Sequence, residues 1–97
     1  MTYTLNLRPR AFAELEVARD QYARVGHAES FMDEIEGVFE VMQAMPLRFP
    51  VVYDTIHRAL LRRFPFAIFF RIRPSTTQVV VLAVFPQRGD PASWPQR

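Results

Sequence analysis

Apolar residues recur about every second position near the N-terminus, then about every 3.6 positions, and again about every second position in the C-terminal half. Residues 3–7, YTLNL, alternate apolar and polar side chains, as a half-buried strand does. Pro9 suits the first turn of a helix, and Gly26 suits its end. Between them apolar residues return every three or four positions, which predicts an amphipathic helix. Its stripe consists of Phe12, Leu15, Ala18, Tyr22 and Val25.

A second helical stripe follows after a short break. Its members are Phe31, Ile35, Val38, Phe39, Met42 and Met45. Ser30, followed by Asp33, is a candidate N-cap, and a start nearer His27 is the alternative. Pro46 ends the pattern. Because the break between the two helices is short, we expect them to form an antiparallel hairpin.

The C-terminal half predicts three strands, over residues 56–63, 66–73 and 78–85, whose short connections favour antiparallel hairpins. Residues 79–85 are apolar at every position, so this strand is expected inside the sheet and covered on both faces. The strand over 56–63 is expected at the outside. Residues 47–55 are interpreted as a connector, because Pro50 excludes a central strand.

These elements predict an α+β fold in a single domain spanning residues 1–97. We expect a small, antiparallel-rich, four-stranded sheet with an N-terminal helical hairpin packed on one face, in the order β-α-α-β-β-β. A chain of 97 residues has room for one modest core.

The amino-acid composition limits the kinds of site that the chain can form. The chain has no cysteine, which excludes disulfides and thiolate metal sites and fits a reducing cytosol. No apolar run is long enough to span a membrane, and no targeting segment is recognised, so we expect a soluble, cytoplasmic protein. All 12 basic residues are arginine. Arginine suits interfaces with carboxylates and phosphates, although codon bias is the simpler reason for the absence of lysine.

Catalytic and cofactor motifs are not found in the sequence. His27 and His57 lie thirty positions apart without metal-ligand spacing, so no metal is expected. With three glycines and no glycine-rich turn before a helix, no phosphate loop or dinucleotide site is expected either. The helix carboxylates are interpreted as a solvated face. We therefore expect no cofactor and no catalytic residue.

Four stretches together resemble the RelE/ParE superfamily of bacterial toxins. They are the opening strand followed by RPRAFAEL, the proline that closes the second helix, the strand pair RRFPFAIFFRI, and VVVLAVFPQRGDPASW. The ending resembles the ParE branch more than the RelE branch. The resemblance implies a toxin paired with an unstable antitoxin. ParE-like members inhibit DNA gyrase, whereas RelE-like members cut messenger RNA on the ribosome.

The RelE-like reaction implies basic side chains on the sheet and a tyrosine-bearing C-terminal segment. The tail of this chain offers Arg88 but no tyrosine or histidine, and Pro86 stands where many ParE-like sequences have histidine. Arginine stays protonated and is a poor general base. A gyrase-binding toxin without enzymatic activity is therefore favoured, with ribosome-dependent mRNA cleavage as the alternative. A plain interaction module without toxicity is the third possibility, which Pro86 slightly favours.

The residues assigned by this resemblance to target binding are Arg58, Arg62, Arg63, Arg88, Asp90 and Trp94. Each has a structural alternative. Arg62 would instead prevent edge-to-edge sheet aggregation, Arg88 with Asp90 would fix a turn, and Trp94 would pack over the end of the sheet. No direct sequence-specific binding to nucleic acid and no membrane contact are expected.

The chain has more large apolar side chains than two helices on such a sheet readily cover, so part of the apolar surface is expected to form a groove. The resemblance supplies a partner, a ParD-like antitoxin whose disordered C-terminal segment folds across the toxin in a hetero-oligomer. The residues assigned to antitoxin binding are Leu15, Arg19, Tyr22, Phe39 and Arg71.

Overall fold

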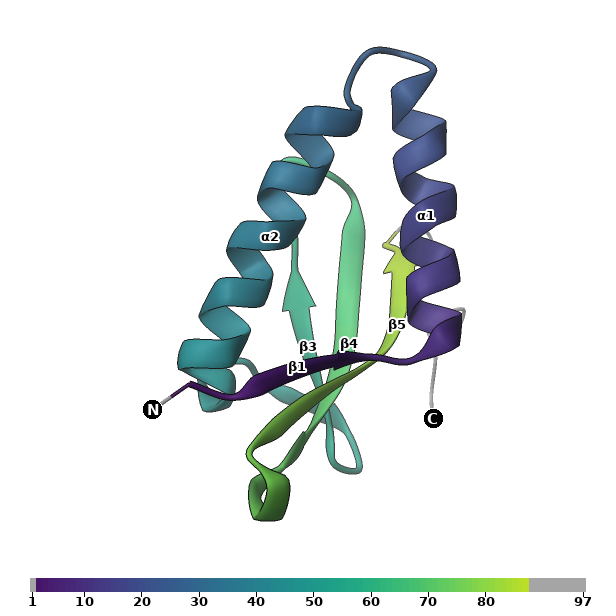
Figure 1. Cartoon of the computed structure of the whole chain (residues 1–97). Helices are drawn as coiled ribbons and strands as arrows, with labels where there is room; N and C mark the ends of the chain where they lie inside the picture. The colour runs from purple at the N-terminus through teal and green to yellow at the C-terminus, as the bar shows by residue number, and fades with distance from the viewer. Residues whose placement is uncertain (1, 88–97) are drawn as a thin grey trace.

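A computed structural model of the chain describes residues 2–87 (Figure 1). The first strand, β1 (Thr4–Leu7), leads into two helices, α1 (Pro9–Ala23) and α2 (Ala28–Ala44). The remaining elements are a 3₁₀ turn at Pro46–Arg48, β2 (Val51–Tyr53), β3 (Ile56–Leu60), β4 (Phe66–Arg73), a 3₁₀ turn at Pro74–Thr76, and β5 (Gln78–Pro86). The α+β class and the positions of both helices are confirmed.

The five strands form one sheet in the order β1-β5-β4-β3-β2. β1 pairs with β5 in parallel, and the other neighbours are antiparallel. β4 accompanies β5 along its whole length, from Arg73 opposite Gln78 to Phe66 opposite Pro86. β1 stops opposite Val81. The second half of β5 therefore has a strand on one side only.

The predicted four-stranded sheet is wrong by one strand, and the predicted element order lacks β2. Residues 47–55 are not a simple connector, because they contain the end of a 3₁₀ turn and all of β2. Pro50 does not prevent this strand, since the ladder begins after it at Val51 and the proline only contributes its carbonyl, which accepts the N–H of Arg58 at 3.0 Å. β2, not β3, is consequently the outer strand.

The two helices form an antiparallel pair that covers one face of the sheet (Figure 1). Phe31, Ile35 and Met42 of α2 are fully buried against this face. β5 lies between two other strands and is buried along most of its length, which confirms its predicted interior place. A smaller apolar cluster, which includes Ile56 and Phe69, lies on the opposite face of the sheet.

The buried stripe of α1 is rotated from the predicted one. Ala11, Leu15 and Ala18 are buried and Tyr22 is half-buried, whereas Phe12 is 52% exposed and Val25 is 64% exposed. Phe12 and Val25, the two ends of the predicted stripe, therefore lie outside the core. Small Ala11 and Ala18 occupy the buried face, which lets α1 pack closely on β5.

α2 starts next to His27, as the alternative prediction had it. The helix begins after His27 with no side-chain cap, so the predicted N-cap at Ser30 is wrong. Gly26 adopts φ +80° in the turn between the helices, a conformation that glycine takes without steric cost. Met45 lies between the end of α2 at Ala44 and Pro46, and it is exposed. Within residues 2–87 no helix is both long and apolar enough to cross a membrane.

Candidate partner-binding groove

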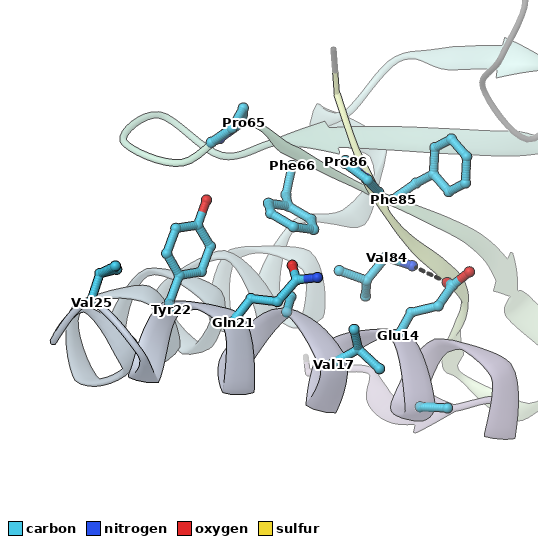
Figure 2. A pocket seen from close by; sticks show the side chains of 12 residues that line it. Glu14, Val17, Gln21, Tyr22, Val25, Pro65, Phe66, Val84, Phe85 and Pro86 are labelled. Atoms are coloured by element: carbon cyan, nitrogen blue, oxygen red, sulfur yellow. Dashed lines mark hydrogen bonds between the residues drawn. The ribbon is translucent and has the colours of Figure 1, made fainter.

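A groove of about 510 Å³ lies between α1 and the adjoining ends of β4 and β5 (Figure 2). From α1 it is lined by Val17, Tyr22 and Val25, and from the strands by Phe66 and Val84, among others. Val17 is 57% exposed, and Val25 is more so. We call this surface the α1–β5 groove. It is apolar and open to solvent, which is typical of partner sites.

The groove follows the part of β5 that lacks a second neighbouring strand. The Val81 carbonyl still accepts the N–H of Arg8 at 3.0 Å, at the end of β1. Further along, the N–H of Val84 donates to Glu14 Oε1 at 2.8 Å, so a side chain of α1 takes the place of a strand carbonyl (Figure 2). Pro86, at the end of β5, has no N–H to offer. The backbone hydrogen-bonding groups along this edge of β5 are thus partly satisfied, and few backbone N–H donors remain available there.

Glu14 is held in this position from the other side by Arg10. Arg10 Nε donates to Glu14 Oε2 at 3.1 Å, one helical turn away. The two oxygens of one carboxylate therefore bind one guanidinium and one strand amide. Charge-assisted bonds of this kind are stronger than neutral ones, so they fix α1 relative to β5.

An aromatic cluster closes one end of the groove. The Tyr22 ring lies 4.9 Å from that of Phe31 and 4.8 Å from that of Phe64, measured between centroids. Phe66 adds an edge-to-face contact at 6.1 Å. Edge-to-face arrangements such as these stabilise beyond the area they bury. The floor of this end is therefore rigid, while the exposed valines at the rim are free to contact a partner.

The loop between β3 and β4 presents Arg62 and Arg63. The Glu34 carboxylate on α2 accepts the backbone N–H of both residues, and Arg63 Nε lies 3.6 Å from Glu34 Oε1. The Arg63 guanidinium also lies 5.9 Å from the ring centroid of Phe64. Glu34 thereby fixes the backbone of the loop while both arginines remain exposed.

Arg58 and Arg71 lie elsewhere. Their chain neighbours on β3 and β4 face the helices, so alternation turns these two side chains to the opposite face of the sheet. Arg71 Nε donates to Thr55 Oγ1 at 3.1 Å. Arg58 is half-buried, whereas Arg71 is exposed. The predicted target-binding arginines therefore do not form one group, because Arg58 is separated by the sheet from the helical face.

A comparison with protein-family models matches residues 5–91 to the ParE toxin of type II toxin-antitoxin systems, parDE. The chain belongs to the ParE toxin family. This match covers most of the chain and confirms the resemblance inferred from the sequence. No curated protein matches the chain in a sequence search.

Solved structures with the same fold include a chain of the chromosomal ParDE toxin-antitoxin system of P. aeruginosa. It is 18% identical to this toxin, with a TM-score of 0.73, and the alignment covers 90% of this chain and 98% of that chain. A chain of the RelBE2 toxin-antitoxin complex of Mycobacterium tuberculosis is 24% identical, with a TM-score of 0.57, over 89% and 99% of the two chains. At these identities the likeness supports the fold.

The toxin's predicted antitoxin-binding residues are spread over several surfaces. Tyr22 lines the α1–β5 groove, and Arg19 is exposed on the same helix with its guanidinium 3.4 Å from Asp20. Leu15 is buried in the core and Phe39 is half-buried against it, so both support the helices. Arg71 lies on the opposite face of the sheet. Of the five, the structure places Tyr22 in the groove wall.

Three of the toxin's predicted target-binding residues, Arg88, Asp90 and Trp94, lie outside the described residues. Their assigned role stays a prediction. Among residues 2–87, no three metal-ligating side chains of the usual kinds are grouped.

Sequence reasoning missed the most exposed groove residues. Val17 and Val25 are apolar residues that do not belong to the buried stripe of α1, and an apolar residue facing outward on an amphipathic helix is the signal that could have identified Val17. Val25 is at the end of the predicted apolar stripe, so the sequence pattern does not distinguish it from the buried members. No local signal could have paired Glu14 with Val84, because the two residues are 70 positions apart in the sequence.

Proposed function

We propose that this toxin inhibits DNA gyrase by binding to it, and that a cognate antitoxin neutralises the toxin by occupying the α1–β5 groove. The observation that carries the proposal is the ParE family match over residues 5–91. A binding role also suits the described surface, which offers an apolar groove and exposed arginines rather than an enclosed cleft with paired acids and bases. The proposed place of action is the cytoplasm.

The α1–β5 groove suits an antitoxin segment for two physical reasons. Its rim carries Val17 and Val25, which an amphipathic segment would cover with its own apolar side chains. Beside it, the half of β5 beyond Val81 is paired with β4 alone, so an extended segment would find room along its other side. A segment that orders only on binding would cover both features and would still be released when the antitoxin is degraded.

The target-binding surface is proposed to include Arg62 and Arg63. Both side chains are exposed, and Glu34 holds the loop backbone so that the entropy lost on binding is limited. Arginine forks bind carboxylates and phosphates bidentately, so this loop suits contact with either gyrase carboxylates or the phosphates of gyrase-bound DNA. Arg88 is proposed as a third member on the strength of the family resemblance.

Ribosome-dependent mRNA cleavage is the second candidate. It is favoured by the placement of Arg58, Arg71 and Arg73, which strand alternation turns to the same helix-free face of the sheet. These arginines would stabilise a developing phosphorane charge. Against cleavage stands the lack of a tyrosine or histidine in the sequence after Phe85, which leaves no side chain suited to general base catalysis there.

Two assays on the purified toxin separate these candidates. One measures supercoiling of relaxed plasmid by gyrase, and the other measures cutting of a defined message on ribosomes. We expect supercoiling to be inhibited and the message to stay intact, with inhibition relieved by adding the product of an adjacent antitoxin gene. Cut messages with unaffected supercoiling would overturn the proposal in favour of the second candidate.

A further inference from the structure

The end of β5 brings the chain to the edge of the α1–β5 groove. Phe85 and Pro86 line the groove, and the N–H of Gln87 donates to the carbonyl of Pro65, another lining residue, at 2.6 Å. The last described residue is therefore held at the groove itself. The sequence continues from there with residues 88–97, so that segment starts beside an apolar surface.

The groove has room for one aromatic side chain. Its volume of about 510 Å³ is similar to that of pockets that enclose drug-sized ligands. Val17 and Val25 on its rim are 57% and 64% exposed, so covering them removes apolar area from water. Trp94 is the one large apolar residue in the segment 88–97, and it is the one tryptophan of the chain. A ring of this kind buries about 150–250 Å² when it is covered.

The sequence before Trp94 is suited to reversing the direction of the chain. β5 and α1 run side by side in the same direction (Figure 1), so a chain that continued straight on from Gln87 would leave the groove. Gly89 and the pair 90–91, Asp-Pro, favour turns. A turn there would return the following residues along the side of β5 that β1 leaves uncovered beyond Val81.

The length of the segment fits this return. Trp94 is three residues beyond Pro91, and three extended residues span roughly 10 Å. Tyr22 and Val17, which line the groove on α1, are about 8 Å apart along the helix axis at 1.5 Å per residue. The ring can therefore reach the groove wall between them. A segment tethered at its own site also has an effective concentration on the order of millimolar there, which favours it over an occupant in solution.

We propose that, in the antitoxin-free toxin, the C-terminal segment 88–97 turns back along β5 and inserts the ring of Trp94 into the α1–β5 groove, against Val17. The segment thereby covers the apolar rim that residues 2–87 leave exposed. The antitoxin proposed above would compete with Trp94 for this surface. The placement of Trp94 itself depends neither on the antitoxin nor on the toxin's target.

The fluorescence of Trp94 tests the proposal, because the chain has no other tryptophan. The full-length, antitoxin-free toxin is compared with the same protein unfolded in urea, with excitation selective for tryptophan and with acrylamide as a neutral quencher. We expect the folded toxin to emit at shorter wavelength and to be quenched less. Val17→Arg places a charge against the buried ring and should weaken docking at least about tenfold, which moves both signals toward those of the unfolded chain.

Leu47→Arg is the matched control. It introduces the same charge at an exposed apolar residue of the 3₁₀ turn after α2, which does not line the groove, and should leave both signals unchanged. A second readout needs no substitution in the described fold. Trp94→Ala removes the ring current of the indole, so the methyl NMR signals of Val17 and Val84 should shift while those of Leu47 stay in place.

A folded toxin whose Trp94 emits and is quenched as in urea would overturn the proposal. So would a shielded Trp94 that Val17→Arg leaves shielded, or that Leu47→Arg exposes equally, because the ring would then not be held by the groove. Shielding that is lost on dilution would also overturn it, since the ring would then insert into a second copy. Circular dichroism verifies that both arginine variants are folded. No antitoxin or gyrase is present in these measurements, so their failure is distinguishable from failure of the proposed function.

Discussion

The carboxylate of Glu14 on α1 accepts the backbone N–H of Val84 on β5 at 2.8 Å, across 70 residues of sequence. It does so where β5 has lost its β1 neighbour, and where a strand carbonyl would otherwise be needed. One side chain thus satisfies an interior strand, joins α1 to the sheet and forms part of the wall of the α1–β5 groove.

Removing this carboxylate should destabilise the fold. Glu14→Ala leaves the amide of Val84 without its partner, and losing a hydrogen bond of this type costs about 1–3 kcal/mol. Glu14→Gln keeps an acceptor and should cost less. Glu16→Ala, an exposed site on the same helix, is the control and should stay within about 0.5 kcal/mol of the wild type. Urea denaturation measures all three, and equal stability of Glu14→Ala and Glu16→Ala would contradict the role of Glu14.

Glu34 should control the order of the loop that carries Arg62 and Arg63. Glu34→Ala removes the acceptor for two backbone N–H groups, so their hydrogen exchange should become faster. Glu36→Ala on the exposed side of α2 should leave the exchange unchanged. If Glu34 also prepares the loop for its target, gyrase inhibition by Glu34→Ala should fall while antitoxin affinity stays the same. Unchanged exchange at Arg62 and Arg63 would exclude Glu34 as the residue that orders this loop.

The two histidines should differ sharply in their contribution to stability. His57 is buried, its Nδ1 lies 2.8 Å from the Phe49 carbonyl, and its ring stacks on Phe70 at 5.1 Å. His57→Ala should lower the free energy of unfolding by about 2–4 kcal/mol, through a lost bond and a new cavity. His27→Ala, at an exposed site, is the matched control. Thermal denaturation compares them, and similar melting temperatures for the two variants would show that His57 does not tie residues 49–50 to the sheet.

Arg88→Ala is predicted to reduce toxicity in cells without unfolding the domain. The prediction rests on the family resemblance of the C-terminal sequence. Growth after induction measures toxicity, and circular dichroism of the purified variant measures folding. A folded variant that is as toxic as the wild type would remove Arg88 from the target-binding surface.

Local sequence patterns were sufficient to predict most of the fold. The spacing of apolar residues typical of a strand or a helix is repeated several times within most elements. Both helices and the strands β1, β3, β4 and β5 followed from these patterns, although β3 ends at Leu60, before the predicted end at Arg63. β2 did not, since three residues are too few to establish a period of two and Pro50 argued against a strand. The predicted stripe of α1 was wrong at its two ends, Phe12 and Val25. Phe12 was chosen because it is more apolar than Ala11 beside it, which is the residue that is buried.

The groove depended on contacts that no local pattern contains. Tyr22 was assigned to a partner surface on its helical position, and it does line the groove. Leu15 was assigned in the same way and lies in the core. What separates them is the position of the end of β5 relative to α1, which is set by the length of β1 and by the Glu14–Val84 bond. Such information becomes available only with the tertiary structure.

The affinity of the cognate antitoxin for two matched variants tests the α1–β5 groove most directly. Val17→Arg and Phe12→Arg introduce the same charge at similarly exposed positions of α1, 57% and 52%, but only Val17 lines the groove. Calorimetry should show a Kd at least about tenfold weaker for Val17→Arg, equivalent to about 1.4 kcal/mol, and an unchanged Kd for Phe12→Arg. Equal affinities for the two variants, or a loss confined to Phe12→Arg, would contradict antitoxin binding in this groove.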